Sequence, residues 1–202
     1  MYNNISGVIL AGGGSKRFNG IIKSKIVLNG RTIISRIIET LNDIFDEIVI
    51  VTNSPDEFKK YNTCKILRDE FLDKGPLGGI HSAMKESGKE ALFVVGGDMP
   101  FLEKELIVKE VDYYNRNKCD ILIPQTGQYI EPLHGIYRNN LLNRLEEYLD
   151  GENDCAFRLF FRKENVFYMQ VEGSENSMRA FTNINSPADI VQAETLLLRQ
   201  ND

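Results

Sequence analysis

Residues 5–25 read ISGVILAGGGSKRFNGIIKSK, and this stretch decides how the chain begins to fold. Its first six residues, Ile5 to Leu10, are an apolar run that predicts a buried strand. The run breaks at Ala11 into three glycines, Gly12, Gly13 and Gly14. Because glycine has no Cβ, such a turn can curl with its backbone N–H groups pointing inward, and this concavity binds anions.

Basic side chains follow the glycines at short range: Lys16, Arg17, Lys23 and Lys25. A guanidinium can grip two phosphate oxygens, so cations added to an amide-lined turn favour a polyphosphate over a lone carboxylate. Neither the GxGxxG spacing nor the P-loop motif is present. Our hypothesis is that the loop holds a nucleoside triphosphate. The alternative is an ordinary glycine-rich turn between strand and helix, with the cations in solvent.

The composition limits the classes of protein to which the chain can belong. It has 202 residues, of which 42% are hydrophobic and 26% charged, and this is typical of one globular domain with a full core. The net charge of −5 argues against an extended nucleic-acid surface, which needs a dense positive footprint. A small phosphorylated ligand needs only local positive charge, so it stays compatible with the acidic total.

Cysteine usage and hydropathy suggest a reduced cytoplasm. Cys64, Cys119 and Cys155 are odd in number and far apart, so neither a disulfide framework nor a zinc site is expected. The N-terminal residues MYNNISGV lack a basic region and carry only a short apolar run, unlike a signal peptide. No apolar stretch approaches the roughly 18–20 residues of a membrane span. We expect no membrane partner.

Strand-like and helix-like segments alternate along the chain. Strands are expected at 5–10, 47–52, 64–67, 91–95, 120–124 and 166–171, with another at 129–137 that Pro132 interrupts. Helices are expected at 33–41 after a Thr32 cap, at 56–61, from the turn at 75–79 to 87, and at 103–117, 139–149, 155–161 and 187–199. This order predicts an α/β fold with a mostly parallel sheet covered on both faces.

Polar residues follow several of the expected strands. The glycine loop, Asn53, Asp69 and Asp98 each come where a strand ends. In parallel sheets, ligands bind beyond the carboxyl ends of the strands, so we expect these residues along one edge. Asn53 and Asp69 offer donors and acceptors to a base or ribose, although a role in their own turns is an equal alternative.

Asp98 is the strongest candidate for chemistry. It follows the strand and two glycines of VVGG, and a carboxylate opposite a phosphate loop suits Mg²⁺, which takes one or two carboxylates plus phosphate oxygens. The alternative is that Asp98 caps the helix that begins near Glu103 or orders its own turn. Lys23 and Lys25 are competing candidates for the cation that stabilises a leaving pyrophosphate. His81 and His134 have no carboxylate or cysteine at ligand spacing, so we interpret both as structural or incidental.

Four segments together resemble one known family. LAGGGSKRF with a following lysine, GPLGGI, GGDMPFL and FTNINSP occur in the order and spacing of molybdenum cofactor guanylyltransferases. These belong to the sugar-phosphate-type nucleotidyltransferases with a Rossmann-like fold, a three-layer sandwich. The resemblance covers about residues 5–195 and implies transfer of GMP from Mg-GTP to molybdopterin-bound molybdenum cofactor, with release of pyrophosphate.

The resemblance also assigns residues. It implies that Arg17, Lys23 and Asp98 are catalytic, with Asp98 as the Mg²⁺ ligand, and that Asn183 and Asn185 lie on the pterin side. The residues expected to bind the nucleotide are Leu10, Ala11, Gly12, Gly13, Gly14, Lys23, Asn53, Asp69, Gly75, Pro76, Leu77 and Asp98.

We expect one domain over 1–202, with a nucleotide-binding half at 1–124 and an acceptor-side half at 125–202. GTP and molybdopterin are the expected small-molecule substrates, and transient contact with cofactor-delivering or acceptor enzymes is a further expectation. Two alternatives stay open. One is a cytidylyltransferase acting on the same cofactor or on a sugar or polyol phosphate, and the other is a nucleotide-binding accessory module without turnover.

Overall fold

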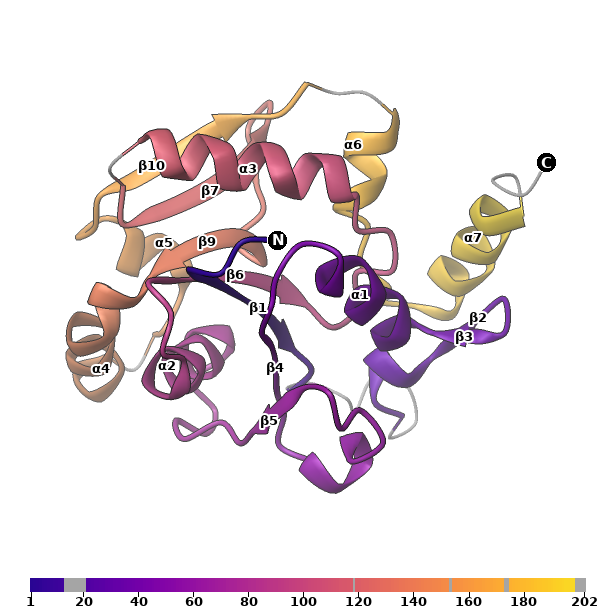
Figure 1. Cartoon of the computed structure of the whole chain (residues 1–202), viewed down its shortest axis with the longest axis horizontal. Helices are drawn as coiled ribbons and strands as arrows, with labels where there is room; N and C mark the ends of the chain where they lie inside the picture. The colour runs from indigo at the N-terminus through magenta and orange to yellow at the C-terminus, as the bar shows by residue number, and fades with distance from the viewer. Residues whose placement is uncertain (13–20, 118, 153, 173–174, 199–202) are drawn as a thin grey trace.

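The computed structural model of the chain describes all residues except 13–20, 118, 153, 173–174 and 199–202. An eight-stranded sheet runs through it in the order β10-β7-β9-β6-β1-β4-β5, with β8 paired to β7 (Figure 1). The strands are β1 (Ile5–Leu10), β4 (Ile48–Val51), β5 (Lys65–Leu67), β6 (Ala91–Gly96), β7 (Ile121–Thr126), β8 (Tyr129–Ile130), β9 (His134–Arg138) and β10 (Val166–Gln170).

Most neighbouring strands are parallel. β1 pairs in parallel with β4 and β6, β4 with β5, and β7 with β10. The exceptions are β9, which is antiparallel to both β6 and β7, and β8, which is antiparallel to β7. The predicted α/β fold with a mostly parallel sheet is therefore confirmed, and the sheet runs without a break through both halves of the chain.

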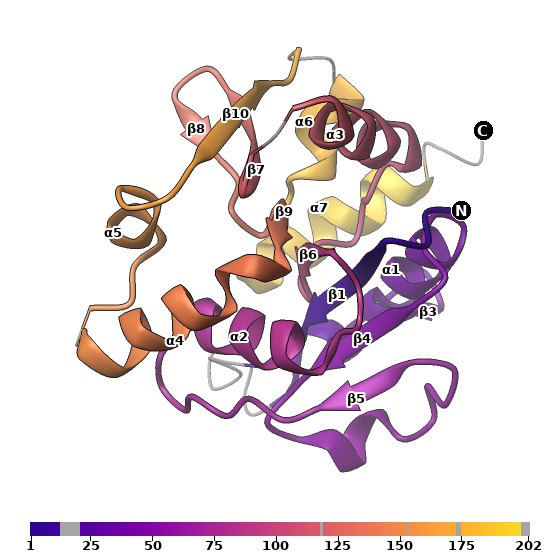
Figure 2. The same ribbon diagram turned by 60° about the vertical axis from the view of Figure 1, so that its left-hand side comes forward.

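Helices cover both faces of the sheet and complete three layers (Figure 2). The helices are α1 (Ile33–Asn42), α2 (Pro76–Glu86), α3 (Lys104–Arg116), α4 (Leu142–Gly151), α5 (Phe157–Phe161), α6 (Glu175–Ala180) and α7 (Pro187–Leu198). Residues of one strand alternate between the layers: Phe93 and Val95 of β6 pack towards α1 and α3, whereas Leu92 and Val94 pack towards α2 and α4.

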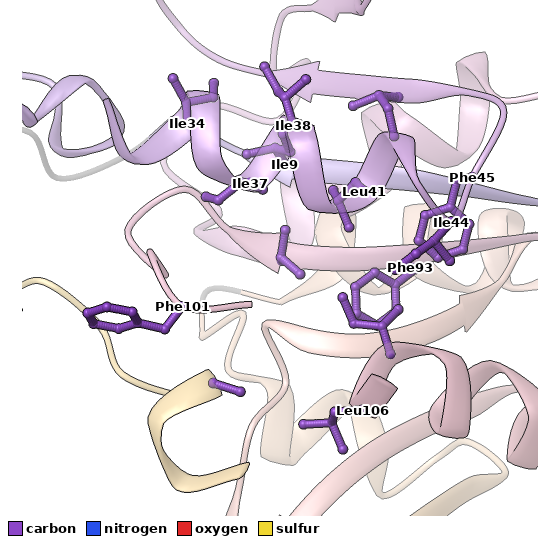
Figure 3. Close-up of a cluster of buried hydrophobic side chains, with 14 of the residues drawn as sticks. Ile9, Ile34, Ile37, Ile38, Leu41, Ile44, Phe45, Phe93, Phe101 and Leu106 are labelled. Carbon is purple, nitrogen blue, oxygen red and sulfur yellow. The ribbon is translucent and has the colours of Figure 1, made fainter. Parts of the chain in front are cut away.

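The buried cluster beneath α1 shows how the sequence pattern becomes packing (Figure 3). Ile34, Ile37, Ile38 and Leu41 recur at helical spacing and face the sheet, where Phe45 stacks on Phe93 with ring centroids 5.5 Å apart. The expected cap is also present, because Thr32 Oγ1 accepts a hydrogen bond from the Ser35 amide at 3.3 Å.

Several local expectations need correction. The strand expected at 129–137 is two strands, β8 and β9, because 131–133 leave the sheet at Pro132, which has no N–H to donate. The helix expected at 56–61 is a 3-10 helix over Pro55–Phe58. The hairpin of β2 (Val27–Leu28) and β3 (Arg31–Thr32) was not predicted. Its two-residue turn is Asn29-Gly30, with both φ angles positive, a strong hairpin signal.

Candidate active site

A cavity of about 460 Å³ opens at the carboxyl ends of β1, β4 and β6, beside the start of α2. This is the edge at which parallel sheets bind ligands. Its walls come mainly from the first 98 residues, and Leu133 is the contribution from the later part of the chain. The lining residues are Leu10, Ala11, Gly12, Ile22, Lys23, Ser24, Val51, Thr52, Asn53, Asp69, Asp73, Gly75, Pro76, Gly79, Gly96, Gly97, Asp98 and Leu133.

The start of the glycine loop lies at this cavity, as expected. Leu10, Ala11 and Gly12 line it, and the Ala11 amide donates to Val51 O at 2.8 Å, so the chain follows β4 up to the turn. Gly13, Gly14 and Arg17 lie outside the described residues, and their assignment to phosphate binding stays a prediction.

The turn after β6 packs directly against the beginning of that loop. The Gly97 amide donates to Leu10 O at 3.0 Å, and a Cβ on Gly97 would lie only 3.0 Å from the same oxygen. A Cβ on Gly96 would lie 2.9 Å from Asp98 Oδ1. The two glycines therefore bring the backbone of one strand end against the other and leave room for the Asp98 carboxylate.

Lys23 completes a polar triad with residues far away in the sequence. Lys23 Nζ donates to Asp98 Oδ2 at 2.9 Å and to Asn185 Oδ1 at 2.6 Å. The Lys23 and Asp98 side chains are only 17% and 23% exposed, so their attraction is screened less than that of a surface pair. Lys25 instead pairs with Glu57 and does not line the cavity. The structure thus places Lys23, and not Lys25, in the candidate site.

The opposite end of the cavity holds the residues expected to meet the nucleoside. Asn53 follows β4 and Asp69 follows β5, and both line the cavity together with Gly75 and Pro76. Asp69 Oδ1 accepts a hydrogen bond from the Phe71 amide at 3.0 Å. Burial raises the pKa of Asp69 to about 6, and this hydrogen bond opposes the rise.

The turn before α2 fixes how its first residues lie relative to the cavity. Gly75 has a φ of +66°, a conformation that favours glycine, and it leads into Pro76 at the first position of α2. Leu77 was expected among the nucleotide-binding residues; its side chain is fully buried in the core beneath α2 and does not line the cavity. The helical spacing turns it towards the sheet, so only its backbone is left for a ligand.

The two asparagines of FTNINSP differ in where they point. Asn185 reaches Lys23, whereas Asn183 Nδ2 donates to Phe181 O at 3.3 Å, and neither asparagine is among the residues that line the cavity. Between them, the Ile184 amide donates to Asp98 O at 2.9 Å. The loop is therefore attached to the Asp98 turn through one backbone bond and, through Lys23, one side-chain bridge.

Some residues at the site were not found from the sequence. Ser24 is buried against Gly97, and Asp73 and Leu133 line the cavity. Asp73 has a φ of +63°, and an Asp shortly before Gly75 is a recognisable turn signal. Leu133 carried no signal, because its place depends on β9 pairing antiparallel with β6. His81 and His134 are both buried and neither lines the cavity, as expected for structural residues.

The arrangement suits one hard cation held jointly with a ligand. No three His, Cys, Asp or Glu side chains in the described part of the chain are grouped to hold a metal alone. Mg²⁺ commonly takes one protein carboxylate and completes its shell with phosphate oxygens and water, and the space left by Gly96 keeps Asp98 accessible for that role. Separately, no helix among the described residues is long and apolar enough to cross a membrane.

Comparison with known proteins places these features in a family. Residues 7–166 match the model of the MobA-like NTP transferase domain. The chain is 36% identical over 205 residues to a probable molybdenum cofactor guanylyltransferase of Natranaerobius thermophilus, covering 98% of each chain. It is 29% identical to a molybdenum cofactor guanylyltransferase of Desulfosudis oleivorans, covering 96% of each.

A solved structure agrees over nearly the whole fold. The chain superposes on the molybdopterin-guanine dinucleotide biosynthesis protein A of Archaeoglobus fulgidus with a TM-score of 0.82 and 26% sequence identity. The match covers 96% of this chain and 99% of the archaeal one.

Proposed function

The chain belongs to the family of MobA-like NTP transferase domains and is a nucleotidyltransferase, and we propose that it moves GMP from Mg-GTP to molybdopterin-bound molybdenum cofactor. The observation that carries this proposal is the Lys23–Asp98–Asn185 triad at the mouth of a cavity built from strand ends. In this triad Lys23, a cation suited to phosphate, is hydrogen-bonded to Asp98, the residue suited to a metal. Lys23 is also hydrogen-bonded to Asn185, in the loop expected at the acceptor.

The nucleotide fits the cavity in one direction. Its base and ribose belong at the end formed by Asn53, Asp69 and Gly75, where amide and carboxylate groups face the space. The proposal puts its α-phosphate beside Asp98 and Lys23, between the nucleotide side and the loop that carries Asn185. The β- and γ-phosphates would then extend towards Leu10–Gly12, away from the acceptor.

The reaction needs no protein nucleophile. A phosphate oxygen of the acceptor attacks the α-phosphorus of GTP, the bond from that phosphorus to the oxygen bridging to the β-phosphate breaks, and pyrophosphate leaves. Asp98 would hold Mg²⁺, which when bound supplies positive charge to the phosphate oxygens. Lys23 would turn from Asp98 towards the α-phosphate and stabilise the charge that develops there. Asn185 would then be free to orient the acceptor.

The test is pyrophosphate release from each of GTP, CTP, ATP and UTP, with Mg²⁺ and molybdopterin-bound cofactor as acceptor. Release with GTP that depends on the acceptor is the expected result. Release with CTP alone would make the protein a cytidylyltransferase. Tight GTP binding without release from any of the four would make it a nucleotide-binding module, an outcome that the Lys23–Asp98 pair argues against.

A further inference from the structure

The acceptor loop, residues 181–186, needs contacts that stay in place when the nucleotide binds. Among the described residues, Ile184 N donates to Asp98 O at 2.9 Å, and Asn185 Oδ1 accepts a hydrogen bond at 2.6 Å from Lys23, which is itself bonded to Asp98. If Lys23 turns to the α-phosphate, as the proposed function requires, its bond to Asn185 is given up during the reaction. The position of the loop must then depend on contacts that the nucleotide does not disturb.

Arg179, in the last turn of α6, makes such contacts at the entrance to the loop. Its Nη2 donates to Glu103 Oε1 at 3.1 Å, and its guanidinium lies 5.6 Å from the centre of the Phe101 ring. Its carbonyl oxygen accepts from the Thr182 amide at 3.0 Å. A planar guanidinium that meets a carboxylate and an aromatic ring together has a fixed orientation, which a flexible ammonium would lack.

Phe101 and Glu103, two of the residues that Arg179 contacts, belong to the segment that carries Asp98. Phe101 and Glu103 follow Asp98 by three and five residues, and Phe101 lies at the edge of the buried cluster beside the ribbon of α6 (Figure 3). The Arg179 and Glu103 side chains are only 15% and 29% exposed, so solvent screens the pair less than an ordinary surface ion pair. The contact therefore connects the start of the acceptor loop to the same turn that presents Asp98.

We propose that Arg179, held by Glu103 and Phe101, is the positioning residue that fixes the acceptor loop relative to Asp98 while Lys23 serves the nucleotide. The inference rests on the proposed function. We call the contacts of Arg179 with Glu103 and Phe101 the clamp. The clamp sets how well the acceptor is aligned. It leaves the nucleotide end of the cavity unchanged, because that end is built from other strand ends.

The first experiment measures initial rates with Arg179→Gln and Glu103→Gln while GTP and acceptor are varied separately. Each variant should raise the KM for the acceptor about tenfold and change the KM for GTP less than about twofold. Lys104→Gln is the matched control, because it breaks the neighbouring Lys104–Asp43 ion pair of 3.0 Å, which lies at the surface. Arg179→Lys keeps the charge but not the planar group and should lie between the wild type and Arg179→Gln.

An unchanged acceptor KM in Arg179→Gln, or equal increases in both KM values, would overturn the inference. The double variant Glu103→Arg/Arg179→Glu restores opposite charges and should recover part of the acceptor KM. A second readout needs no substrate: the Ile184 amide, which donates to Asp98 O, should exchange its hydrogen faster in Arg179→Gln than in the wild type or Lys104→Gln. Equal exchange in all three proteins would also contradict the clamp.

The two measurements separate the inference from the function on which it rests. Absence of transfer from GTP by the wild type would disprove the proposed function, and the exchange rate at Ile184 would still decide whether Arg179 fixes the loop. Transfer by the wild type with an unaffected Arg179→Gln variant would leave the function standing and remove the inference.

Discussion

The nucleotide side of the cavity is made of strand ends, whereas the acceptor loop at 181–186 belongs to no strand and is held largely by side chains. Leu10, Asn53, Asp69 and Asp98 each lie at or just beyond the end of a strand of one parallel array, so the sheet itself sets their spacing. Asn185 takes its place through Lys23, the Ile184 amide and the Arg179 contacts. A site whose spacing is set by the sheet suits the nucleotide, with which the acceptor must be aligned. The acceptor loop depends on a few contacts, so single substitutions can displace it.

Asp98 is where the two regions meet, so its removal should have the largest effect. Asp98→Ala loses the carboxylate that faces Lys23 but keeps the backbone oxygen that accepts from Ile184. We expect kcat to fall by on the order of 10³-fold or more, because charge stabilisation at the phosphates is lost. The thermal melting temperature should change by only a few degrees. Turnover close to that of the wild type would refute a metal role for Asp98.

The two lysines of the 3-10 helix at Lys23–Lys25 test the comparison next. Lys23→Ala should lower kcat by about 10²-fold, since it removes the cation that bridges the two regions. Lys25→Ala is its matched control, because Lys25 pairs with Glu57 outside the cavity, and its kcat should stay within about twofold of the wild type. Equal losses of kcat in Lys23→Ala and Lys25→Ala would contradict the assignment of Lys23 alone to the candidate site.

Asn185 should separate the two substrates. Asn185→Ala removes the oxygen that reaches Lys23 without touching the nucleotide end, so we expect the acceptor KM to rise about tenfold and the GTP KM to change much less. Asn140→Ala, which breaks an exposed contact to Asp120, provides the control. Equal losses for both substrates would place Asn185 on the wrong side of the reaction.

Asp69 gives the smallest effect and a dependence on pH. Its pKa of about 6 means that the carboxylate is lost between pH 7 and pH 5, and with it the hydrogen bonds that we propose it accepts from the nucleoside. GTP affinity measured by calorimetry should therefore fall a few-fold more in the wild type than in Asp69→Asn over that range. The titration of the GTP phosphates affects the wild type and Asp69→Asn equally, so it cancels in this comparison. Parallel pH profiles would exclude Asp69 from nucleoside contact.

The same raised pKa predicts the opposite trend for folding. The folded protein binds the Asp69 proton more tightly than the unfolded chain, whose ordinary pKa is 3.8, so this group's contribution to stability is complete below that value and is lost as the pH rises through about 6. Asp69→Asn should accordingly gain stability relative to the wild type on going from pH 4 to pH 7, as measured by denaturant unfolding. A constant difference would mean that burial does not raise this pKa.

The same contrast between strand ends and the acceptor loop explains how far the sequence could be interpreted. Apolar runs separated by helical periodicities predicted the parallel sheet, and the strand-end rule then brought Asn53, Asp69 and Asp98 to one edge. The acceptor asparagines were assigned by resemblance alone, because the pairing of residues 162 positions apart, Lys23 and Asn185, follows from no local pattern. Gly13, Gly14 and Arg17 lie outside the described residues and stay predictions.

The choice between Lys23 and Lys25 shows why the remaining details needed coordinates. Both lysines are equally basic and equally near the glycine loop in sequence, but a 3-10 helix has about three residues per turn, so residues two apart point in different directions. Which of them enters the cavity depends on how that short helix packs, with its middle residue Ser24 buried against the Gly97 turn. The burial of the Leu77 side chain also needed coordinates, because a motif match does not say which face of α2 packs against the sheet.

The central claim is that Asp98 and the strand-end cavity hold a metal-bound triphosphate together. The most direct measurement is the calorimetric Kd for GTP with and without Mg²⁺, in the wild type and in Asp98→Asn, which keeps the size of the side chain. The account predicts that Mg²⁺ tightens GTP binding at least about tenfold in the wild type and hardly at all in the variant. The same Mg²⁺ enhancement in both proteins would contradict it.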